Sequence, residues 1–427
     1  MPDLQQLETW DAVFVGAGPA GSLAARELAL RGRSVLLVDR AAFPRGKVCG
    51  CCLNGQALFT LRAAGLPSLT ARLGARKLTE VRIAAAGRQA RVPLPAGEAL
   101  SREAFDAALI EEGTAAGVAF LPATAAYVGE TSGGYRRVAL ETAAAAGRQF
   151  GARQVGARHV AARVVLAADG LSGQSLRGLP EFAPRVAVDA RLAAGAVLEA
   201  DATDNGAAEY REGTITLACG RGGYLGLVRL EDGRLDVAAA FDRAALRRAG
   251  QPAALAAEVL RQARLPVPRG MERAEWRGTP PLTRRREKLA GERLFLLGDA
   301  ASYVEPFTGE GMAWAMTSAL LAAPLADAAI DAWSDSLADQ WEAAHRSAFG
   351  AARRRCRTIA LALRSPALAA LGVAALRAAP WLAGPVVRRL NRPPRGFNSM
   401  PQVLAAAPPL ATTATHGIAP LEPQAAR

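Results

Sequence analysis

The chain of 427 residues has little histidine and little cysteine, and both scarcities exclude kinds of chemistry. Its histidines are His159, His345 and His416, so a histidine-built metal site or a Ser-His-Asp triad has almost no raw material. Five cysteines do not make the disulfide framework of a secreted protein in a chain this long. We therefore expect a reducing compartment and no bound metal.

Long apolar runs are also missing. The uncharged run from Gly311 to Ala326 is shorter than the ~20 residues that cross a bilayer, and the uncharged tail from Gly396 is interrupted by prolines. The N-terminus has no basic region followed by an apolar stretch, so we expect no signal peptide. These features predict a cytoplasmic protein whose contact with membranes is at most peripheral.

Acidic residues are absent from one long stretch near the C-terminus. Residues 351–395 hold ten arginines and no acid, which leaves a net charge of +3 for residues 1–350 out of +13 for the chain. Two interpretations of this basic stretch stay open: a cationic amphipathic segment lying on an anionic membrane, or a helical cap on the protein body. Nucleic acid is not expected as a partner, because Trp381 is the only aromatic residue there and cannot form a stacking platform alone.

The N-terminal forty residues follow a strand–turn–helix–strand pattern. Ala12 to Val15 is a short apolar run typical of a buried strand, Ser22 to Leu30 is helical in composition, and Ser34 to Val38 is a second strand. This order within about thirty residues predicts a right-handed βαβ unit of a parallel sheet.

A glycine-rich turn joins the first strand to the helix. Val15-Gly16-Ala17-Gly18-Pro19-Ala20-Gly21 fits G-x-G-x-x-G, in which Gly16 permits the tight turn, Gly18 lets a pyrophosphate approach and Gly21 lets the helix pack on the strand. The unpaired N–H groups of the helix then face the phosphates. Asp39 closes the second strand, where its carboxylate can accept hydrogen bonds from a ribose. The sequence therefore predicts a dinucleotide site.

The remaining chain alternates strands, turns and helices. We expect helices at Glu103 to Ala116, near Pro252 to Arg264 and at Gly311 to Ala329, and a buried strand at Arg293 to Leu297. Residues 181–280 carry turn glycines between short strand-like runs, which predicts a separate α+β lobe. A pentad repeat at 151–165 predicts a hairpin loop that leads into a strand from Arg163 to Ala168.

Two later strands end in acidic dipeptides, and short motifs accompany them. Asp169-Gly170 and Gly298-Asp299 each follow an apolar strand, Lys47-Val48-Cys49-Gly50 follows the second strand, and Pro306-Phe307-Thr308-Gly309-Glu310-Gly311 follows the Gly-Asp pair. With these motifs the chain, from about residue 11 to 325, resembles the flavoprotein oxidoreductases of the p-hydroxybenzoate hydroxylase fold group. Within that group it is most similar to the geranylgeranyl reductase family.

The resemblance implies an α/β fold: a Rossmann-type FAD-binding domain (glutathione-reductase-like), an α+β substrate domain and a C-terminal helical segment. The implied divisions are FAD-binding domain 1–80, 101–180 and 281–345, substrate domain 81–100 and 181–280, basic helical segment 346–398, and disordered tail 399–427.

The resemblance also implies FAD as cofactor and a set of residues that bind it. These are Gly16, Gly18, Pro19, Ala20, Gly21, Asp39, Arg40, Lys47, Arg102, Asp169, Gly298, Asp299, Pro306, Gly309, Gly311 and Met312. The positive end of the helix that Gly311 and Met312 open would favour negative charge on the flavin. Without the resemblance, a turn aspartate is the better interpretation of Asp169, and a helix-start residue with its head in solvent is the better interpretation of Arg102.

Three cysteines crowd together at Cys49, Cys51 and Cys52. Tetrahedral zinc needs two pairs of ligands, and Cys219 and Cys356 are single and distant. A redox dithiol lacks Cys-x-x-Cys spacing. We interpret the three as small side chains lining the flavin edge, with Cys49 placed near the reacting ring by resemblance.

These patterns predict an FAD-dependent oxidoreductase acting on a hydrophobic small molecule of isoprenoid, polyketide or aromatic type. The Thr308-Gly309-Glu310-Gly311 block favours double-bond reduction. Gly223 to Arg229, however, has neither the tryptophan nor the Phe-Pro pair of the family's substrate strand, which keeps a flavin monooxygenase as an alternative. A non-catalytic flavin- or lipid-surface-binding protein is the second alternative. No second G-x-G-x-x-G is present, so NAD(P)H visiting transiently, or a separate reductase, would supply the electrons.

Overall fold

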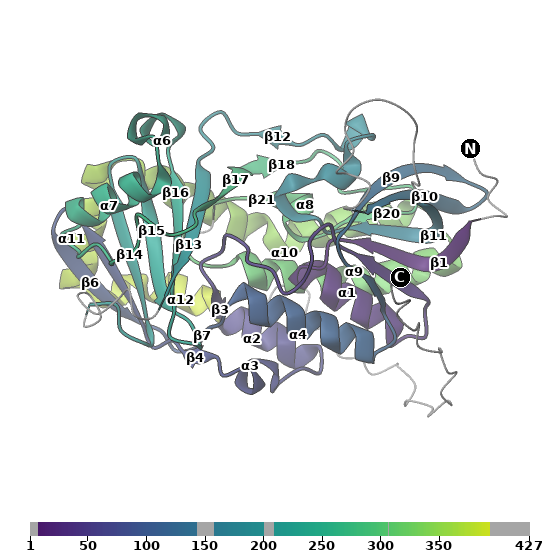
Figure 1. Cartoon of the computed structure of the whole chain (residues 1–427), viewed down its shortest axis with the longest axis horizontal. Coiled ribbons are helices and arrows are strands. Elements are labelled where there is room, and N and C mark those ends of the chain that lie inside the picture. The colour runs from purple at the N-terminus through teal and green to yellow at the C-terminus, as the bar shows by residue number, and fades with distance from the viewer. Residues whose placement is uncertain (1–6, 143–157, 200–208, 306, 393–427) are drawn as a thin grey trace, which may run out of the picture.

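The computed structural model describes residues 7–142, 158–199, 209–305 and 307–392. Two lobes lie side by side, each built on its own sheet, and the chain crosses between them several times (Figure 1). The C-terminal helices run along both lobes. The predicted α/β class, with an α+β second lobe and C-terminal helices, is confirmed.

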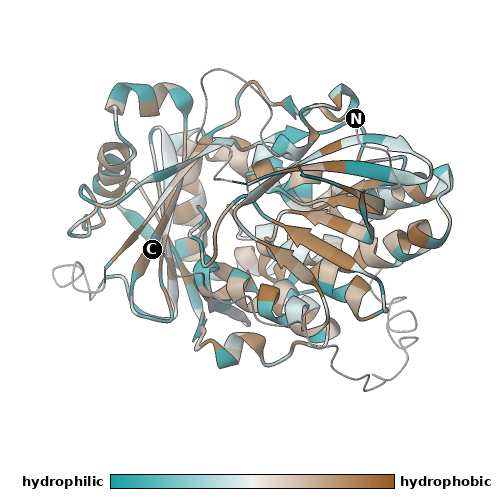
Figure 2. Ribbon diagram, turned by 45° about the vertical axis from the view of Figure 1, so that its right-hand side comes forward, coloured by the Kyte–Doolittle hydropathy of each residue, from teal (hydrophilic) through white to brown (hydrophobic). Residues whose placement is uncertain are grey.

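The first lobe is built on a mainly parallel sheet in the order β19-β20-β11-β1-β2-β8. Its strands are β1 (Glu8–Val15), β2 (Val35–Val38), β8 (Ala119–Leu121), β11 (Arg158–Ala167), β19 (Ala290–Gly291) and β20 (Leu294–Leu296). Strand β2 and the second half of β1 are fully buried and apolar, as expected of parallel strands covered on both faces (Figure 2). Strands β9 (Thr124–Ser132) and β10 (Tyr135–Thr142) add an antiparallel extension to β11.

Helices cover this sheet and place their N-termini at its carboxyl edge. They are α1 (Pro19–Ala29), α2 (Gly55–Ala63), α3 (Leu69–Arg72), α4 (Arg102–Ala115), α8 (Gly298–Ala301) and α9 (Gly311–Asp331). The predicted βαβ unit is present as β1, α1 and β2, which pair in parallel. Helix α9 is long and apolar enough to cross a membrane, but two-thirds of its most apolar window is buried against α1 and α2. It is the core helix of this lobe.

The second lobe is a seven-stranded, largely antiparallel sheet in the order β17-β13-β16-β15-β14-β5-β6. Its strands are β5 (Glu80–Ala85), β6 (Arg88–Pro93), β13 (Leu192–Leu198), β14 (Thr214–Gly220), β15 (Gly223–Arg229), β16 (Leu235–Phe241) and β17 (Arg277–Pro281). Helix α7 (Pro252–Gln262), preceded by α6 (Arg243–Ala249), packs its apolar side on one face of the sheet. The other face looks toward the first lobe and helix α11.

Small elements join the lobes. Strands β3 (Cys52–Asn54), β4 (Arg76–Lys77) and β7 (Gly97–Ala99) form one three-stranded sheet, and β12 (Arg185–Val186), β18 (Arg284–Arg285) and β21 (Ser302–Tyr303) form another. Short 3-10 turns follow β11 at Gly170–Ser172, Gln174–Leu176 and Pro180–Phe182. These connections fix the lobes against each other and place residues 45–54 and 299–309 between them.

The C-terminal helices are α10 (Asp335–Ala362), α11 (Pro366–Ala378), the 3-10 turn η6 (Pro380–Ala383) and α12 (Gly384–Leu390). The structure differs here from the expected boundary at residue 346, because α10 runs through it as one helix. Trp341, His345 and Phe349 form a continuous buried face on α10, with neighbouring ring centroids 5.7 Å and 4.9 Å apart. Burial lowers the pKa of His345 to about 3, so it is a neutral core residue.

Element boundaries agree closely with expectation except around the pentad repeat. The predicted strand at Arg163–Ala168 begins earlier, at Arg158, because it pairs with β10 as well as β1. The rest of the repeat lies outside the described residues, as does the predicted tail 399–427.

Candidate functional site

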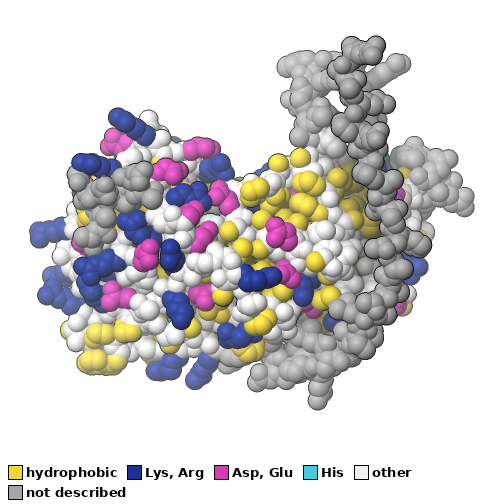
Figure 3. Space-filling view, turned by 60° about the horizontal axis from the view of Figure 1, so that its bottom comes forward, with side chains coloured by type: hydrophobic (Ala, Val, Ile, Leu, Met, Phe, Trp, Pro, Cys, Tyr) yellow, Lys and Arg dark blue, Asp and Glu magenta, His cyan; other side chains and the backbone are white. Residues whose placement is uncertain are grey.

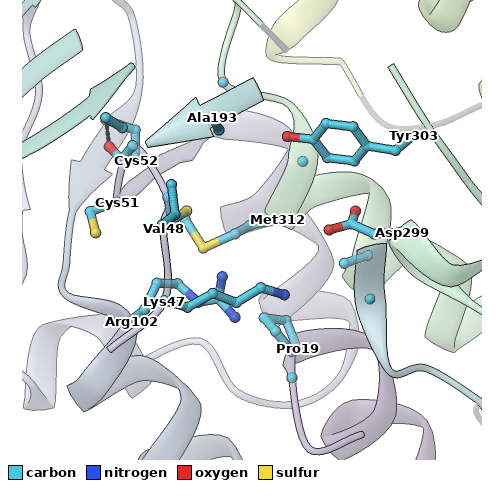
Figure 4. Close-up of a pocket in the computed structure, with 18 of the residues that line it drawn as sticks. Pro19, Lys47, Val48, Cys51, Cys52, Arg102, Ala193, Asp299, Tyr303 and Met312 are labelled. Carbon is cyan, nitrogen blue, oxygen red and sulfur yellow. Dashed lines mark hydrogen bonds between the residues drawn. The ribbon is translucent and has the colours of Figure 1, made fainter. Parts of the chain in front are cut away.

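One cavity of about 1020 Å³ lies between the two lobes. Its walls come from the glycine turn after β1, the segment 45–54, the start of α4, the turn after β11, the segment 299–312 and the inner face of the seven-stranded sheet. Figure 4 shows Lys47 and Arg102 approaching from one side, with Asp299 and Tyr303 on the other and Met312 between.

The glycine turn has the backbone that the motif requires. Gly16 has a φ of +105°, a conformation that favours glycine, and a side chain there would overlap the Ala168 carbonyl. A side chain on Gly21 would overlap the Gly16 carbonyl, so this residue lets α1 pack against the turn. A methyl group on Gly18 would meet only the guanidinium groups of Arg102 and Arg45, at 3.8 and 3.9 Å. Gly18 therefore leaves an open cradle at the N-terminus of α1, lined by positive charge.

Asp39 supports this turn from the end of β2. One carboxylate oxygen accepts a hydrogen bond from the Ala17 N–H at 2.8 Å and the other from the Ala41 N–H at 2.9 Å. Each oxygen keeps a further lone pair, and the side chain lines the cavity, so a ribose hydroxyl can still be bound. Arg40 also lines the cavity but is exposed at its rim.

Arg102 is buried at the start of α4, not solvated as a lone helix-start residue would be. Ser101 caps this helix by accepting from the Ala104 N–H. Arg102 makes a bidentate pair with Asp106 one turn later, at 2.9 and 2.7 Å. Arg45 lies 3.5 Å from the same carboxylate and 3.7 Å from Asp39. Two guanidinium groups thus face one buried carboxylate and the Gly18 cradle, an arrangement suited to phosphate oxygens.

Lys47 and Asp299 face each other across the cavity (Figure 4). Burial lowers the pKa of Lys47, as does the charge of Arg102, while Asp299 opposes the shift. Burial likewise raises the pKa of Asp299 against the pull of Lys47 and Arg102. The neighbouring Tyr303 has a pKa well above its ordinary value, because of burial and the charge of Asp299, so its phenol keeps its proton at neutral pH.

Asp169 sits at the carboxyl end of β11 with an unsatisfied oxygen. Its Oδ2 accepts from the Ser175 N–H at 2.9 Å, whereas Oδ1 is buried and has no hydrogen-bond partner among the described residues. Burial raises the pKa of this carboxyl. A buried carboxylate oxygen without a hydrogen-bond donor costs free energy, and a ligand bound in the cavity could donate the missing hydrogen bond.

The segment before α9 presents backbone to the cavity. Gly309 has a φ of +70° and open space around its α-carbon, and Gly311 and Met312 open α9 at the wall. Glu310 is buried beneath them and accepts hydrogen bonds from Thr308 at 2.6 Å, Arg355 at 2.6 Å and the Cys356 thiol at 3.0 Å. Because Arg355 and Cys356 lie on α10, the C-terminal helix holds this segment in place.

The three clustered cysteines lie at the cavity wall. Cys51 has a φ of +48°, which turns the chain sharply between Cys49 and Cys52. A hydrogen bond from the Cys51 thiol lowers the pKa of Cys49, helped by the positive charge of Arg102. The same hydrogen bond raises the pKa of Cys51, and burial raises that of Cys52. Within the described residues no group of three His, Cys, Asp or Glu side chains could hold a metal ion.

Beyond the charged region the cavity becomes aliphatic. The inner face of the seven-stranded sheet contributes Ile83, Val92, Ile215, Leu217 and Val228. The C-terminal helices cover the opposite side with Leu376, Leu382, Val386, Val387 and Leu390. Tyr224, in the strand that departs from the prenyl-reductase pattern, stands at this wall edge-on to Phe307, with ring centroids 5.0 Å apart. We call this part the aliphatic compartment.

Most residues predicted from the sequence meet at this cavity. Those that line it are Gly16, Gly18, Pro19, Ala20, Asp39, Arg40, Lys47, Cys49, Arg102, Asp169, Asp299, Gly309, Gly311 and Met312. Gly21 packs α1 instead, and Gly298, with a φ of +54°, donates its N–H to Ser318 at 3.0 Å. Pro306 lies outside the described residues.

Sequence reasoning missed Arg45, Asp106 and Tyr303. The pairing of Asp106 one helical turn after Arg102 was a signal available in the sequence, since residues four apart share a helix face. The open cradle at Gly18, the facing guanidinium groups and the orphaned oxygen of Asp169 together fit FAD: an acidic pyrophosphate at α1, polar groups along a ribityl chain and a ring near Met312.

Comparisons with known proteins agree with this fit. Residues 9–354 match the FAD binding domain family. Menaquinone reductase of Mycobacterium tuberculosis (strain CDC 1551 / Oshkosh) is 30% identical over 375 residues, which cover 83% of this chain and 84% of that protein.

Two solved structures show the same fold. A geranylgeranyl bacteriochlorophyll reductase-like protein from Thermoplasma acidophilum has a TM-score of 0.70 at 19% identity, covering 87% of this chain and 92% of its own. A flavin-dependent brominase has a TM-score of 0.70 at 16% identity, covering 90% of this chain and 93% of its own.

Proposed function

Because the chain belongs to the FAD binding domain family and is an FAD-dependent oxidoreductase, we propose that it reduces a carbon–carbon double bond in a lipophilic substrate of isoprenoid-quinone type. FAD supplies the hydride-transfer chemistry when bound, and NAD(P)H is the proposed source of electrons. The M. tuberculosis relative is named a menaquinone reductase, which supports a quinone that carries an apolar chain.

The observation that carries this proposal is the continuity of the cavity. The polar part near Lys47 and Asp299 opens directly into the aliphatic compartment, without a wall between them. A substrate with a polar ring and a long hydrocarbon chain matches this change of character along one cavity. A small polar substrate would leave the aliphatic side chains in contact with water, and this contact costs free energy in proportion to the exposed apolar surface area.

In this proposal the residues of the chain orient the cofactor and the substrate and exclude water, and none of them acts as a nucleophile. Arg102 and Arg45 hold negative charge at one end, and Lys47 and Asp299 face each other across the polar part of the cavity. The compartment keeps water from the reacting carbons. The described cavity wall offers no Ser-His pair, which suits chemistry supplied by a cofactor.

A flavin monooxygenase remains the second candidate. The observation that favours it is the departure of β15 from the prenyl-reductase pattern, since this strand lines the cavity without the tryptophan or the Phe-Pro pair of that pattern. The likeness to halogenase structures is at low identity and bears on the fold alone. A non-catalytic flavin- or lipid-binding protein is the third candidate, and a separate reductase could replace NAD(P)H as electron source.

Product identification separates these candidates. The FAD-loaded protein is incubated with NADH or NADPH and a polyprenylated naphthoquinone in detergent, and the quinone is extracted for mass spectrometry. The proposed reductase adds two hydrogens, retained after the quinol ring is re-oxidised in air. A product with one added oxygen supports the monooxygenase. Unchanged quinone with no oxidation of either nicotinamide across a panel of lipophilic substrates would support the non-catalytic alternative.

A further inference from the structure

Large hydrophobic side chains are exposed mainly on one short segment. Of the eight such residues in the described part of the chain, five lie between residues 361 and 382. Leu368 is 54% exposed, Leu371 65%, Trp381 73% and Leu382 55%. Scattered exposed leucines are ordinary, but a cluster of this kind marks an interaction surface.

Helix α11 is turned so that it shows an uncharged face outward. Ala369, Ala370 and Val373 are buried against β5 and β6 of the second lobe. Leu368, Leu371, Gly372 and Ala375 lie on the opposite, exposed side. A surface helix normally carries polar residues there, so this outer face is suited to apolar surroundings.

The arginines of this region fall into two groups. Arg355, Arg357 and Arg364 turn inward and pair with Glu310, Asp189 and Asp242. The exposed Arg377, Arg388, Arg389 and Arg392 make no ion pair with any described residue. The stretch from 351 to 395 contains no acid, so these outer charges have no local partner in sequence. Figure 3 shows many Lys and Arg side chains, with Asp and Glu side chains between them, over the half of the molecule that holds the seven-stranded sheet.

The exposed segment also borders the cavity. Leu382 is both exposed and part of the wall of the aliphatic compartment, and Leu376, Val386 and Val387 continue that wall inward. A lipophilic molecule at the outer face of α11 and η6 is therefore next to the compartment.

We propose that α11, η6 and α12 dock this protein on an anionic lipid surface and that the aliphatic compartment takes its substrate from that surface. Helix α11 has 13 residues, about 20 Å, which is too short to cross the ~30 Å hydrocarbon core. It lies along the interface, with Leu368 and Leu371 in the lipid and the outer arginines at the headgroups. The docking stands on its own; the delivery of substrate rests on the proposed reductase function.

Vesicle co-sedimentation of the full-length, FAD-loaded protein tests the docking. The probes are vesicles of phosphatidylcholine alone and of phosphatidylcholine with about one-third phosphatidylglycerol, a content chosen to give a strongly negative surface. Wild type is expected to bind the anionic vesicles and to be released by high salt. The variant L368S/L371S should lose at least about tenfold in partitioning, because two leucines no longer enter the lipid.

A matched control is V186S/V188S, which changes two exposed apolar residues near β12, outside the docking segment. It should bind as wild type does. The yellow colour of bound FAD and the melting temperature show that each variant is folded. The docking is overturned if wild type stays in the supernatant, or if L368S/L371S binds like the control. It is equally overturned if L368S/L371S turns a dimer into a monomer by sedimentation velocity while wild type ignores vesicles, because the face would then join two copies of this chain.

Delivery of the substrate is tested separately by activity. A polyprenyl quinone placed in anionic vesicles should be turned over more slowly by L368S/L371S, whereas a short-chain quinone added in detergent should react at the wild-type rate. Equal rates in vesicles would contradict the delivery. If wild type acts on neither substrate, the proposed function fails and the vesicle-binding result still decides the docking.

Discussion

At the scale of single residues, some glycines of the turn are required by the fold and one by the cofactor. A side chain on Gly16 or Gly21 would overlap backbone of the same lobe, so the fold itself requires glycine at these two positions. Gly18 has an ordinary φ of −82° and faces the cavity, so nothing in the fold alone forbids a side chain there.

We predict that G18A folds normally and binds FAD at least about tenfold more weakly, because its methyl group fills the space left for the pyrophosphate. The free energy of unfolding without FAD should change by less than about 1 kcal/mol. G16A is the contrast, since it must adopt a strained backbone and displace Ala168, and should be expressed poorly or melt early. Flavin fluorescence titration and thermal unfolding measure both. Wild-type FAD affinity in G18A would argue against this placement of the pyrophosphate.

The second prediction at this scale concerns Cys49. Its lowered pKa means that the thiolate is present at lower pH than in an ordinary cysteine, so alkylation by iodoacetamide should already be fast near pH 7. The other cysteines with raised pKa values should react slowly, and bound FAD should protect Cys49. C51A removes the thiol that donates a hydrogen bond to Cys49 and should move the midpoint of the Cys49 pH profile upward. Mass spectrometry of alkylated peptides checks this; uniform labelling of all five cysteines would contradict it.

The sequence predicted most single residues of the site, and the reason is local. Glycine spacing and Asp39 describe one turn between adjacent elements, which neighbouring residues determine. Arg45 escaped because its contact with Asp106 joins the segment after β2 to helix α4, which no local pattern encodes. Tyr303 escaped because it belongs to no motif, although it follows Asp299 by four residues.

At the scale of elements, the joint between α10 and the body depends on a small charge cluster. Asp189, in the turn before β13, accepts two hydrogen bonds from Arg357 at 2.7 Å and lies 3.5 Å from Arg364. The hydrogen bonds from Arg357, and then the charges of both arginines, lower the pKa of Asp189.

A lowered pKa in the folded state means that this carboxylate stabilises the protein above its ordinary pKa of about 3.9 and ceases to do so as the pH falls through the folded value. D189N should therefore reduce the free energy of unfolding at pH 7 by about 1 kcal/mol, a modest amount because the pair is one-third exposed. The difference from wild type should shrink toward zero at a second, acid pH that lies below the lowered pKa of Asp189. Urea unfolding at the two pH values measures it, and a difference that persists in acid would show that the charge is not responsible.

A second joint ties α10 to the cavity itself. Glu310 is almost fully buried and holds Arg355, Cys356 and Thr308. E310Q should leave the Arg355 guanidinium without its counter-charge and lower the free energy of unfolding by about 3 kcal/mol. FAD release on heating should occur earlier as well, because Gly309 and Gly311 lose their support. D339N, which changes an exposed acid on α10 outside this cluster, is the control. Equal effects in the two variants would show that Glu310 has no special role.

Elements with local signals were predicted well, and so was the helical character of the C-terminal segment, but the roles of its arginines were not. The first βαβ unit and the helix after Ser101 follow periodic patterns and caps, so their boundaries came within a few residues. The basic stretch looked uniform in sequence, yet its arginines divide into an inward group and an outward group. That division depends on where Asp189, Asp242 and Glu310 lie in space, which only the fold provides.

At the scale of the whole molecule, two sheets and a C-terminal helical layer enclose one cavity that changes from charged to aliphatic. Ion pairs within the fold leave the net charge of +13 unchanged, and the outer arginines lie beside exposed leucines rather than near the dinucleotide site. The fold could be predicted from motifs, but the aliphatic compartment could not, because its walls come from four distant parts of the chain.

The most direct test of the central claim is a single-turnover measurement without oxygen. The FAD-loaded protein is bleached with one equivalent of NADPH, or NADH if that is the better donor, and then mixed with a polyprenylated naphthoquinone under strict anaerobic conditions. The account predicts that the yellow absorbance of FAD returns on mixing and that one equivalent of quinone carries two additional hydrogens on its chain. Absorbance that returns only when air is admitted, with the chain unreduced, would contradict it.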